Sequence, residues 1–242
     1  MTICIAAIAT EDGKELVVFS TDHMVTTHAG QFEHSIIKYK QLNSHTIAML
    51  SGHALLIDDL TKLESLPDTS FEKIERDIYE NFKKKRKEVI KNEIFNVYGI
   101  DETFFINALK SPVPNPFVHS ILDKVSNFEL HTSIILTGFD DGKARISEIT
   151  ESGHVDFRPM NFHAIGSGTI QAMNTLLFQK HSKFANLCET IYNVYKAKRN
   201  AEVMEGVGKE TEVLILREGG LEKLSSEILL SLRDTACSHI LN

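Results

Sequence analysis

The chain has 242 residues, of which 42% are hydrophobic and 24% are charged, and its formal net charge is −7 at pH 7. This length suits one large domain or two small ones, and the composition is ordinary for a globular protein. The negative charge argues against a nucleic-acid-binding protein, and no apolar run approaches the length of a membrane span, so we expect neither kind of partner.

Cysteine usage indicates the cellular compartment. The three cysteines, Cys4, Cys188 and Cys237, are odd in number and widely spaced. No Lys or Arg precedes Lys14, so the N-terminus lacks the pattern of a secretory signal peptide. We therefore expect reduced thiols in a cytoplasmic protein.

The N-terminal run of apolar and β-branched residues at 3–8 predicts a buried strand with Thr2 at its head. Initiator methionine is usually removed before a small residue, and removal of Met1 would leave Thr2 with both a hydroxyl and a free α-amine. An α-amine with a pKa near ~8 is partly neutral at physiological pH and can act as the base for the hydroxyl. Many chains begin with Met-Thr by chance, so this pattern alone does not identify a nucleophile.

Two later residues extend this hypothesis. Residues 16–22 predict the antiparallel return strand, which ends at Asp22, and the next predicted strand, 36–39, carries Lys38 between apolar neighbours. A half-buried lysine is costly unless it is paired or used. Beside Asp22, Lys38 would lower the pKa of the Thr2 amine or hydroxyl and orient it. The alternative is an edge-strand lysine that prevents aggregation.

Helices are predicted in the middle of the chain, over 52–66 and over about 70–97. The second contains the basic run 83–87, which is most often a solvated helix face, although a docking surface for an acidic partner is the alternative. The Pro-rich stretch 111–116 predicts an extended surface connection.

The second half returns to strands and then helices. Four strands are predicted between 132 and 165, helices over about 169–179 and 183–203, and a final hairpin over 212–221. Hairpins in both halves, with helices between them, indicate antiparallel sheets covered by helices rather than a parallel fold.

Several short segments occur in an informative order. They are Thr2 at the head of a strand, residues 20–26 around Asp22, residues 37–39 around Lys38, the segment 48–54 (Ala-Met-Leu-Ser-Gly-His-Ala) and the segment 162–168 (Phe-His-Ala-Ile-Gly-Ser-Gly). In this order they resemble a proteasome β-type subunit, of the N-terminal nucleophile (Ntn) hydrolase superfamily. The resemblance covers about residues 2–66 and, more loosely, 132–217.

The resemblance implies an α+β fold, a four-layer αββα sandwich of two antiparallel sheets flanked by helices. A single domain over 1–242 is expected, with an extended helical insertion at about 67–131, where the resemblance fades. It also implies that Ser167 lies near the terminal amine and that the Met49 N–H is the oxyanion donor, at a position where the family has glycine. Asn200 is the nearest match to an aspartate of the family, which removes a charge from the surroundings of the amine.

We expect no cofactor and no metal. The segment 166–168 (Gly-Ser-Gly) imitates a dinucleotide loop, but the third glycine position is Gln171. His23, His28 and His34 have no metal-ligand spacing.

Together these features predict a threonine-dependent amide-bond hydrolase, a peptidase. The Thr2 hydroxyl attacks a peptide or amide carbonyl, its amine takes the proton, Lys38 and Asp22 tune and orient it, and the Met49 N–H holds the oxyanion. The alternatives are an Ntn-type amidase or acyl-transfer ligase that acts on specific amides, and a catalytically silent ring-assembly subunit. The resemblance also implies a homo-oligomeric ring and an ATP-dependent unfoldase as partner.

Overall fold

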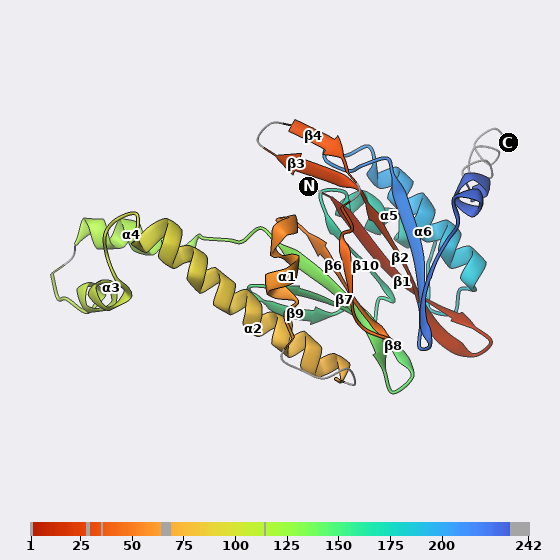
Figure 1. Ribbon diagram of the computed structural model, residues 1–242, viewed down its shortest axis with the longest axis horizontal. Helices are drawn as coiled ribbons and strands as arrows, with labels where there is room; N and C mark the ends of the chain where they lie inside the picture. Colours follow the sequence, from red (N-terminus) through yellow and green to blue (C-terminus); the bar gives the residue numbers. More distant parts are fainter. Residues whose placement is uncertain (1, 28–29, 35, 64–68, 114, 233–242) are drawn as a thin grey trace.

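The chain folds around two antiparallel five-stranded sheets, in a mixed α+β architecture (Figure 1). The computed structural model describes residues 2–27, 30–34, 36–63, 69–113 and 115–232. The first sheet has the order β10-β1-β2-β11-β12, and the second has the order β5-β6-β7-β8-β9. A separate hairpin pairs β3 with β4.

The strand bounds agree with most of the predicted strands. The first sheet contains β1 (Ile3–Glu11), β2 (Lys14–Asp22), β10 (Phe162–Gly166), β11 (Thr211–Arg217) and β12 (Gly220–Lys223). The second contains β5 (Tyr39–Asn43), β6 (Thr46–Ser51), β7 (Ser133–Asp140), β8 (Lys143–Thr150) and β9 (Gly153–Asp156). The hairpin of β3 (Met24–Thr27) and β4 (Gly30–Glu33) was not predicted.

Strand β1 separates two hydrophobic cores, because successive side chains of a strand point to opposite faces of its sheet. Cys4 and Ala6 belong to a cluster whose other members come from the facing strands of both sheets. Ile3 and Ile5 belong to a second cluster, which packs the first sheet against helices α5 (Thr169–Phe178) and α6 (Leu187–Ala201). Because both faces of β1 are buried, its sequence is a continuous apolar run instead of an alternation of apolar and polar residues.

The other face of the second sheet packs against α1 (Ile57–Leu60) and α2 (Phe71–Ile90). The buried residues of α2 at this contact recur at helical spacing: Phe71, Ile74, Ile78 and Phe82. The helix predicted over 52–66 is shorter in its described part, where the 3₁₀ turn η1 (Ala54–Leu56) leads into α1 and the last predicted residues, 64–66, lie outside the described chain.

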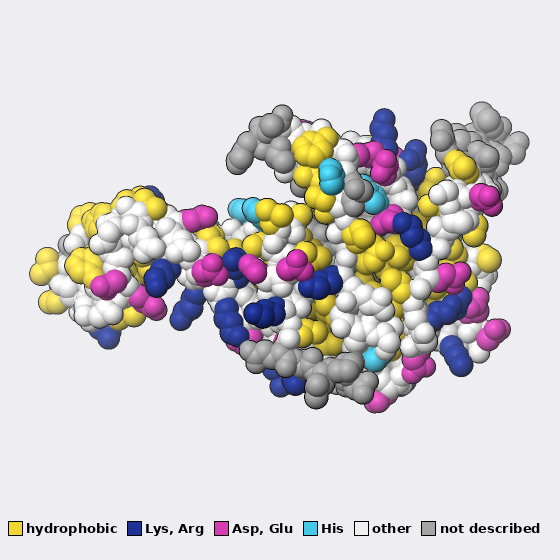
Figure 2. Space-filling view, viewed as in Figure 1, with side chains coloured by type: hydrophobic (Ala, Val, Ile, Leu, Met, Phe, Trp, Pro, Cys, Tyr) yellow, Lys and Arg dark blue, Asp and Glu magenta, His cyan; other side chains and the backbone are white. Residues whose placement is uncertain are grey.

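Beyond the second sheet, α2 leads into a small group of helices that projects from the body (Figure 1). The helix continues through one π-helical turn, η2 (Lys91–Phe95), and is followed by α3 (Glu102–Leu109) and α4 (Pro116–Ser126). We call residues 90–126 the helical lobe. Its own hydrophobic cluster consists of Ile90, Ile94, Phe95, Phe105, Val118 and Ile121. Figure 2 shows that many hydrophobic side chains also remain on its surface.

In the lobe, the structure differs from the sequence prediction for the Pro-rich stretch. Residues 111–116 were expected to be an extended connection. Residues 111–113 and 115 are outside any helix or strand as expected, and 114 lies outside the described residues, but α4 begins at Pro116, where the Asn115 side chain caps it by accepting from the Phe117 N–H at 3.0 Å. Proline is well tolerated in the first turn of a helix, where its missing N–H has no acceptor to lose. Among the described residues, no helix has both the length and the apolar character needed to cross a membrane.

Candidate active site

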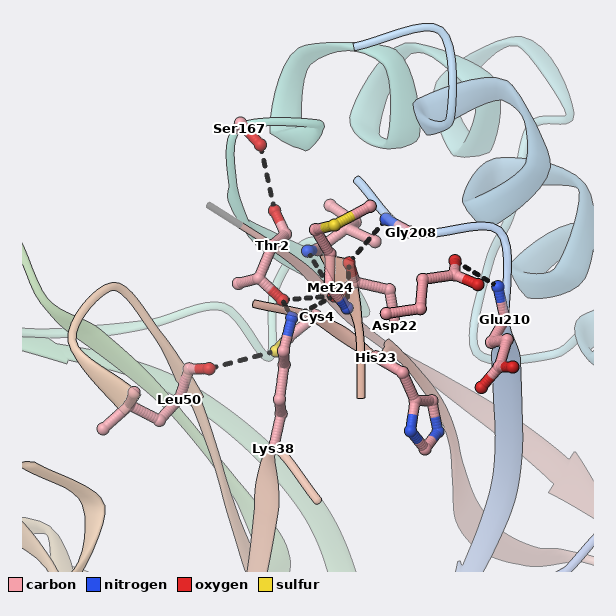
Figure 3. Close-up of polar contacts among 12 residues, drawn as sticks. Thr2, Cys4, Asp22, His23, Met24, Lys38, Leu50, Ser167, Gly208 and Glu210 are labelled. Atoms are coloured by element: carbon pink, nitrogen blue, oxygen red, sulfur yellow. Dashed lines mark hydrogen bonds and ion pairs between the residues drawn. The ribbon is translucent and has the colours of Figure 1, made fainter. Parts of the chain in front are cut away.

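Thr2 lies immediately before β1 and is almost completely buried. Its hydroxyl donates a hydrogen bond to Asp22 Oδ1 and accepts one from Lys38 Nζ (Figure 3). Both functions of the hydroxyl are therefore engaged by charged groups. A hydroxyl between an ammonium and a carboxylate has a donor for its oxygen and an acceptor for its proton, which is the environment that a nucleophile requires.

Asp22 ends β2 and has no exposed surface. Besides the contacts with Thr2 and Lys38, Oδ1 accepts from the Ile3 N–H at 3.1 Å. The second oxygen, Oδ2, accepts from the N–H groups of Met24 at 3.3 Å and Gly208 at 2.7 Å. These backbone donors satisfy the buried carboxylate and hold its orientation.

Lys38 lies immediately before β5, where its carbonyl still accepts from the Leu50 N–H of β6 at 2.9 Å. Its ammonium donates to Asp22 Oδ1 at 2.8 Å, and only 6% of its surface is exposed. The lysine is thus paired inside the protein, whereas the alternative use as an edge-strand lysine requires an exposed ammonium. Thr2, Asp22 and Lys38 come together as a buried hydrogen-bonded set.

Ser167 follows β10 and contacts the main chain of Thr2. Its N–H donates to the Thr2 carbonyl at 2.9 Å and its hydroxyl donates to the same oxygen at 3.3 Å. The contact made is therefore with the carbonyl of Thr2, next to the position expected from the resemblance. Gly166 has φ +113°, and a Cβ there would lie 2.1 Å from the Thr2 carbonyl oxygen, so only glycine allows this approach.

No protein-family model matches this chain, and no curated protein matches its sequence.

Met49 does not have the position expected of an oxyanion donor, and this prediction needs correction. It lies inside β6, opposite Tyr39 of β5 and Ile135 of β7. Because the Leu50 N–H points to β5, the alternation of an antiparallel ladder directs the Met49 N–H toward β7, where it belongs to the sheet. The Met49 side chain is completely buried in the core between the sheets.

Gly52 carries a backbone N–H near Thr2 that the sequence interpretation did not consider. It is the first residue after β6, and its N–H has no acceptor among the described residues. Its φ is +109°, and a Cβ there would lie 2.2 Å from the His131 carbonyl oxygen. The end of β6 lies beside Thr2, because the Ser51 hydroxyl oxygen is 3.1 Å from where a Cβ on Gly166 would stand. The glycine inside the segment 48–54, which carries part of the resemblance, was the available signal.

Asn200, the expected neighbour of the amine, points elsewhere. Its side-chain amide donates to Thr175 Oγ1 at 2.9 Å and so joins α6 to α5. The polypeptide after α6 reaches the site through Gly208 instead, whose N–H contacts Asp22. Sequence reasoning had no signal for this contact, because a backbone N–H carries no side-chain signature.

Cys4 is the other nucleophilic side chain near Thr2, but its chemistry is suppressed. Its thiol has no exposed surface and donates to the Leu50 carbonyl at 3.6 Å. Burial raises the pKa of the Cys4 thiol far above its ordinary value, although the nearby Lys38 ammonium partly opposes this. A thiol that stays protonated is a poor nucleophile, so Thr2 is the reactive candidate. Within the described chain, no group of three or more His, Cys, Asp and Glu side chains is arranged to hold a metal.

Proposed function

We propose that the protein is an N-terminal threonine hydrolase that cleaves amide bonds, and that its substrates are peptides. The observation that carries the proposal is the buried contact set in which the Thr2 hydroxyl lies between the Lys38 ammonium and the Asp22 carboxylate. A buried ion pair centred on one hydroxyl is costly to maintain for structure alone, since apolar residues of similar volume usually serve as well.

The proposed reaction begins with removal of Met1, which frees the Thr2 amine. The Thr2 hydroxyl oxygen forms a bond to the substrate carbonyl carbon, while its proton passes to the amine directly or through a water molecule. The tetrahedral intermediate then loses the amine part of the substrate, which leaves with that proton. Water hydrolyses the resulting ester, and the hydroxyl regains its proton.

The neighbouring groups have separate tasks in this scheme. Lys38 stabilises negative charge that develops on the Thr2 oxygen, and Asp22 holds Lys38 and the hydroxyl in register. The N–H of Gly52 replaces that of Met49 as the proposed oxyanion donor, because it lies at the free end of β6 beside Thr2. The two Ser167 contacts fix the Thr2 main chain, so that the hydroxyl stays in place as bonds change.

The order of the layers supports an Ntn-hydrolase fold. Helices α5 and α6 cover the outer face of the first sheet, the two sheets share a core, and α2 covers the outer face of the second. This succession corresponds to the αββα sandwich that the resemblance to proteasome β-type subunits implies. The layer order therefore supports the proposal through topology, beside the support that the contact set gives through side chains.

The decisive experiment combines intact-mass measurement with labelling by a β-lactone, an electrophile that acylates hydroxyl nucleophiles. We expect the active protein to lack Met1 and to gain one probe mass on Thr2. Thr2→Ala keeps a small second residue, so Met1 is still removed, but labelling and hydrolysis should fall at least ~10²–10⁴-fold. Thr10→Ala, at the other end of β1, is the matched control and should label normally.

Two results would contradict the proposal. The first is a preparation that retains Met1 completely and still turns over a peptide substrate with Thr2 labelled. The second is a Thr2→Ala variant that hydrolyses the same substrate at the wild-type rate.

We further propose that the chain assembles into a homo-oligomeric ring, with an ATP-dependent unfoldase as its partner, because a freely accessible threonine nucleophile would cleave unfolded chains without selection. Exposed hydrophobic side chains on and after α5, namely Ile170, Leu177, Phe178 and Phe184, offer a surface for subunit contacts. Light scattering after size exclusion at micromolar concentration tests assembly. A monodisperse monomer of 27.2 kDa would favour an open-cleft amidase or ligase instead.

A further inference from the structure

Lys198 is a buried charge that the proposed chemistry does not yet use. It lies in the last turns of α6, and its side chain has no exposed surface. Burial lowers the pKa of the Lys198 ammonium, whereas the contact with Glu202 raises it. A fold that needed only to fill this space would be served by an apolar side chain. The contacts of the ammonium must therefore explain why a lysine occupies this position.

The three acceptors of Lys198 lie on the polypeptide that follows α6. Its Nζ donates to Glu202 Oε1 at 2.6 Å and to the carbonyl oxygens of Gly208 at 2.7 Å and Lys209 at 3.0 Å. An ammonium has three protons, so its donor capacity is fully used. Two of the three bonds fix the carbonyl side of residues 208–209.

The N–H side of the same segment faces carboxylates. Gly208 donates to Asp22 Oδ2 at 2.7 Å, and the N–H groups of Lys209 and Glu210 both donate to Glu33 Oε1. The segment is thus held from one side by Lys198 and presents its N–H groups to Asp22 and Glu33 on the other. Figure 3 shows Gly208 beside Asp22, and Glu210 farther from Thr2.

We propose that Lys198 is a positioning residue for the Thr2 nucleophile and acts through Gly208 and Asp22. By fixing the Gly208 carbonyl, it keeps the Gly208 N–H on Asp22 Oδ2, which leaves Oδ1 turned toward Thr2 and Lys38. This inference rests on the proposed function, because it assigns Lys198 a role in the same reaction.

The test measures the rate constant of inactivation, kinact, and the binding constant, KI, for the β-lactone probe. In Lys198→Met, a change of similar volume, we expect kinact to fall about 10- to 100-fold, because small displacements of reacting groups are costly, while KI changes little. Lys196→Met is the matched control: the same substitution on α6, at a lysine that contacts Tyr192 rather than residues 208–209. It should leave kinact unchanged.

A double-mutant cycle separates positioning from a general structural role. If Lys198 acts through Asp22, the loss in kinact caused by Lys198→Met should largely disappear in the Asp22→Asn background, measured by intact mass over long incubations. An equal loss in both backgrounds would show that Lys198 supports the fold only, and a wild-type kinact in Lys198→Met would overturn the inference directly.

A second perturbation covers the case in which Lys198→Met does not fold. In Gly208→Ala, the new Cβ would lie 2.8 Å from Glu33 Oε1 and 3.0 Å from the Met24 nitrogen, so the segment must shift. We expect the same fall in kinact and the same coupling to Asp22→Asn, and a normal kinact would overturn the inference.

If the wild-type protein labels no more than Thr2→Ala, the proposed function fails and this inference with it. If the wild type labels on Thr2 and Lys198→Met labels as fast, only this inference fails.

Discussion

Replacing Lys38 with methionine tests whether its buried ion pair serves the fold, the reaction or both. The Lys38 ammonium donates to Asp22 Oδ1 at 2.8 Å, and the exposed fractions of the two side chains are 6% and 0%. Removing one member of such a pair leaves an uncompensated buried charge, which usually costs ~3–5 kcal/mol. Because three backbone N–H groups remain on Asp22, we expect the free energy of unfolding to fall by about 3 kcal/mol.

The same substitution removes the donor to the Thr2 hydroxyl oxygen. Loss of a group that assists proton transfer or stabilises developing charge typically costs ~10²–10⁴ in rate, so we expect kcat to fall by at least about 10²-fold. Urea denaturation measures the stability, and hydrolysis of a fluorogenic peptide amide measures kcat. Both are measured at a temperature at which each variant is fully folded.

A double variant separates the two effects. Lys38→Met combined with Asp22→Asn removes both charges, so we expect much of the lost stability to return while kcat stays low. Lys40→Met is the control, because the Lys40 ammonium lies near the surface and pairs with the exposed carboxylate of Asp58. It should change neither quantity appreciably. If Lys38→Met kept a near wild-type kcat, the assigned catalytic role would have to be abandoned.

Two further predictions concern the surroundings of Thr2. Gly166→Ala places a Cβ 2.1 Å from the Thr2 carbonyl oxygen and should reduce β-lactone labelling at least ~10²-fold. The control is Gly153→Ala, which is also at positive φ but has nothing within 4 Å of the new Cβ, and it should label normally. Equal labelling of both variants would refute the idea that the close contact between Gly166 and Thr2 positions the nucleophile. Burial raises the pKa of the Cys4 thiol, so above pH 9 the folded chain keeps a thiol proton that the unfolded chain loses. Because the folded state then binds more protons than the unfolded state, the free energy of unfolding falls as pH rises. The contribution of this thiol is up to ~1.4 kcal/mol per pH unit. The urea midpoints at pH 8 and pH 10 should therefore differ less in Cys4→Ala than in wild type. If the difference between the two midpoints were the same in both proteins, the raised pKa of the Cys4 thiol would be contradicted.

Much of the strand pattern could be predicted from the sequence, because it depends on local signals. Strand β1 is recognised from its apolar run, and the turn before Lys14 and the hairpin at 140–143 are recognised from their turn residues. In each case the residues that carry the signal are close together in the sequence. The same reasoning extends to Thr2, Asp22 and Lys38. Strand pairing places Thr2 and Asp22 at one end of the first sheet, and a lysine among apolar neighbours needs a partner.

The remaining features depend on contacts that leave no side-chain signature. Gly208 reaches Asp22 with a backbone N–H across 186 positions of sequence, and nothing in its neighbours indicates this. The Met49 N–H belongs to the ladder between β6 and β7, and the proposed donor Gly52 follows three residues later, because the end of β6 depends on its pairing with β7. Helix α4 was missed since a run rich in proline was interpreted as a whole, whereas the last residue of that run, Pro116, begins the helix.

The small size of the lobe cluster has a consequence for local stability. Helix α2 and its continuation η2 contribute to two cores: Phe82 packs against the second sheet, while Ile90 and Ile94 pack with α3 and α4. The described residues of the lobe bury six hydrophobic side chains in this cluster, which is a small core. Arg86, which donates to the Val125 and Phe128 carbonyls, lies at the junction of the lobe with the body. We expect such a unit to open at a lower free energy than the sheets, so the amide hydrogens of α3 and α4 should exchange with solvent while those of β1 stay protected. Local opening of the lobe should therefore leave the geometry around Thr2 undisturbed, because that geometry is held by the two sheets and residue 208.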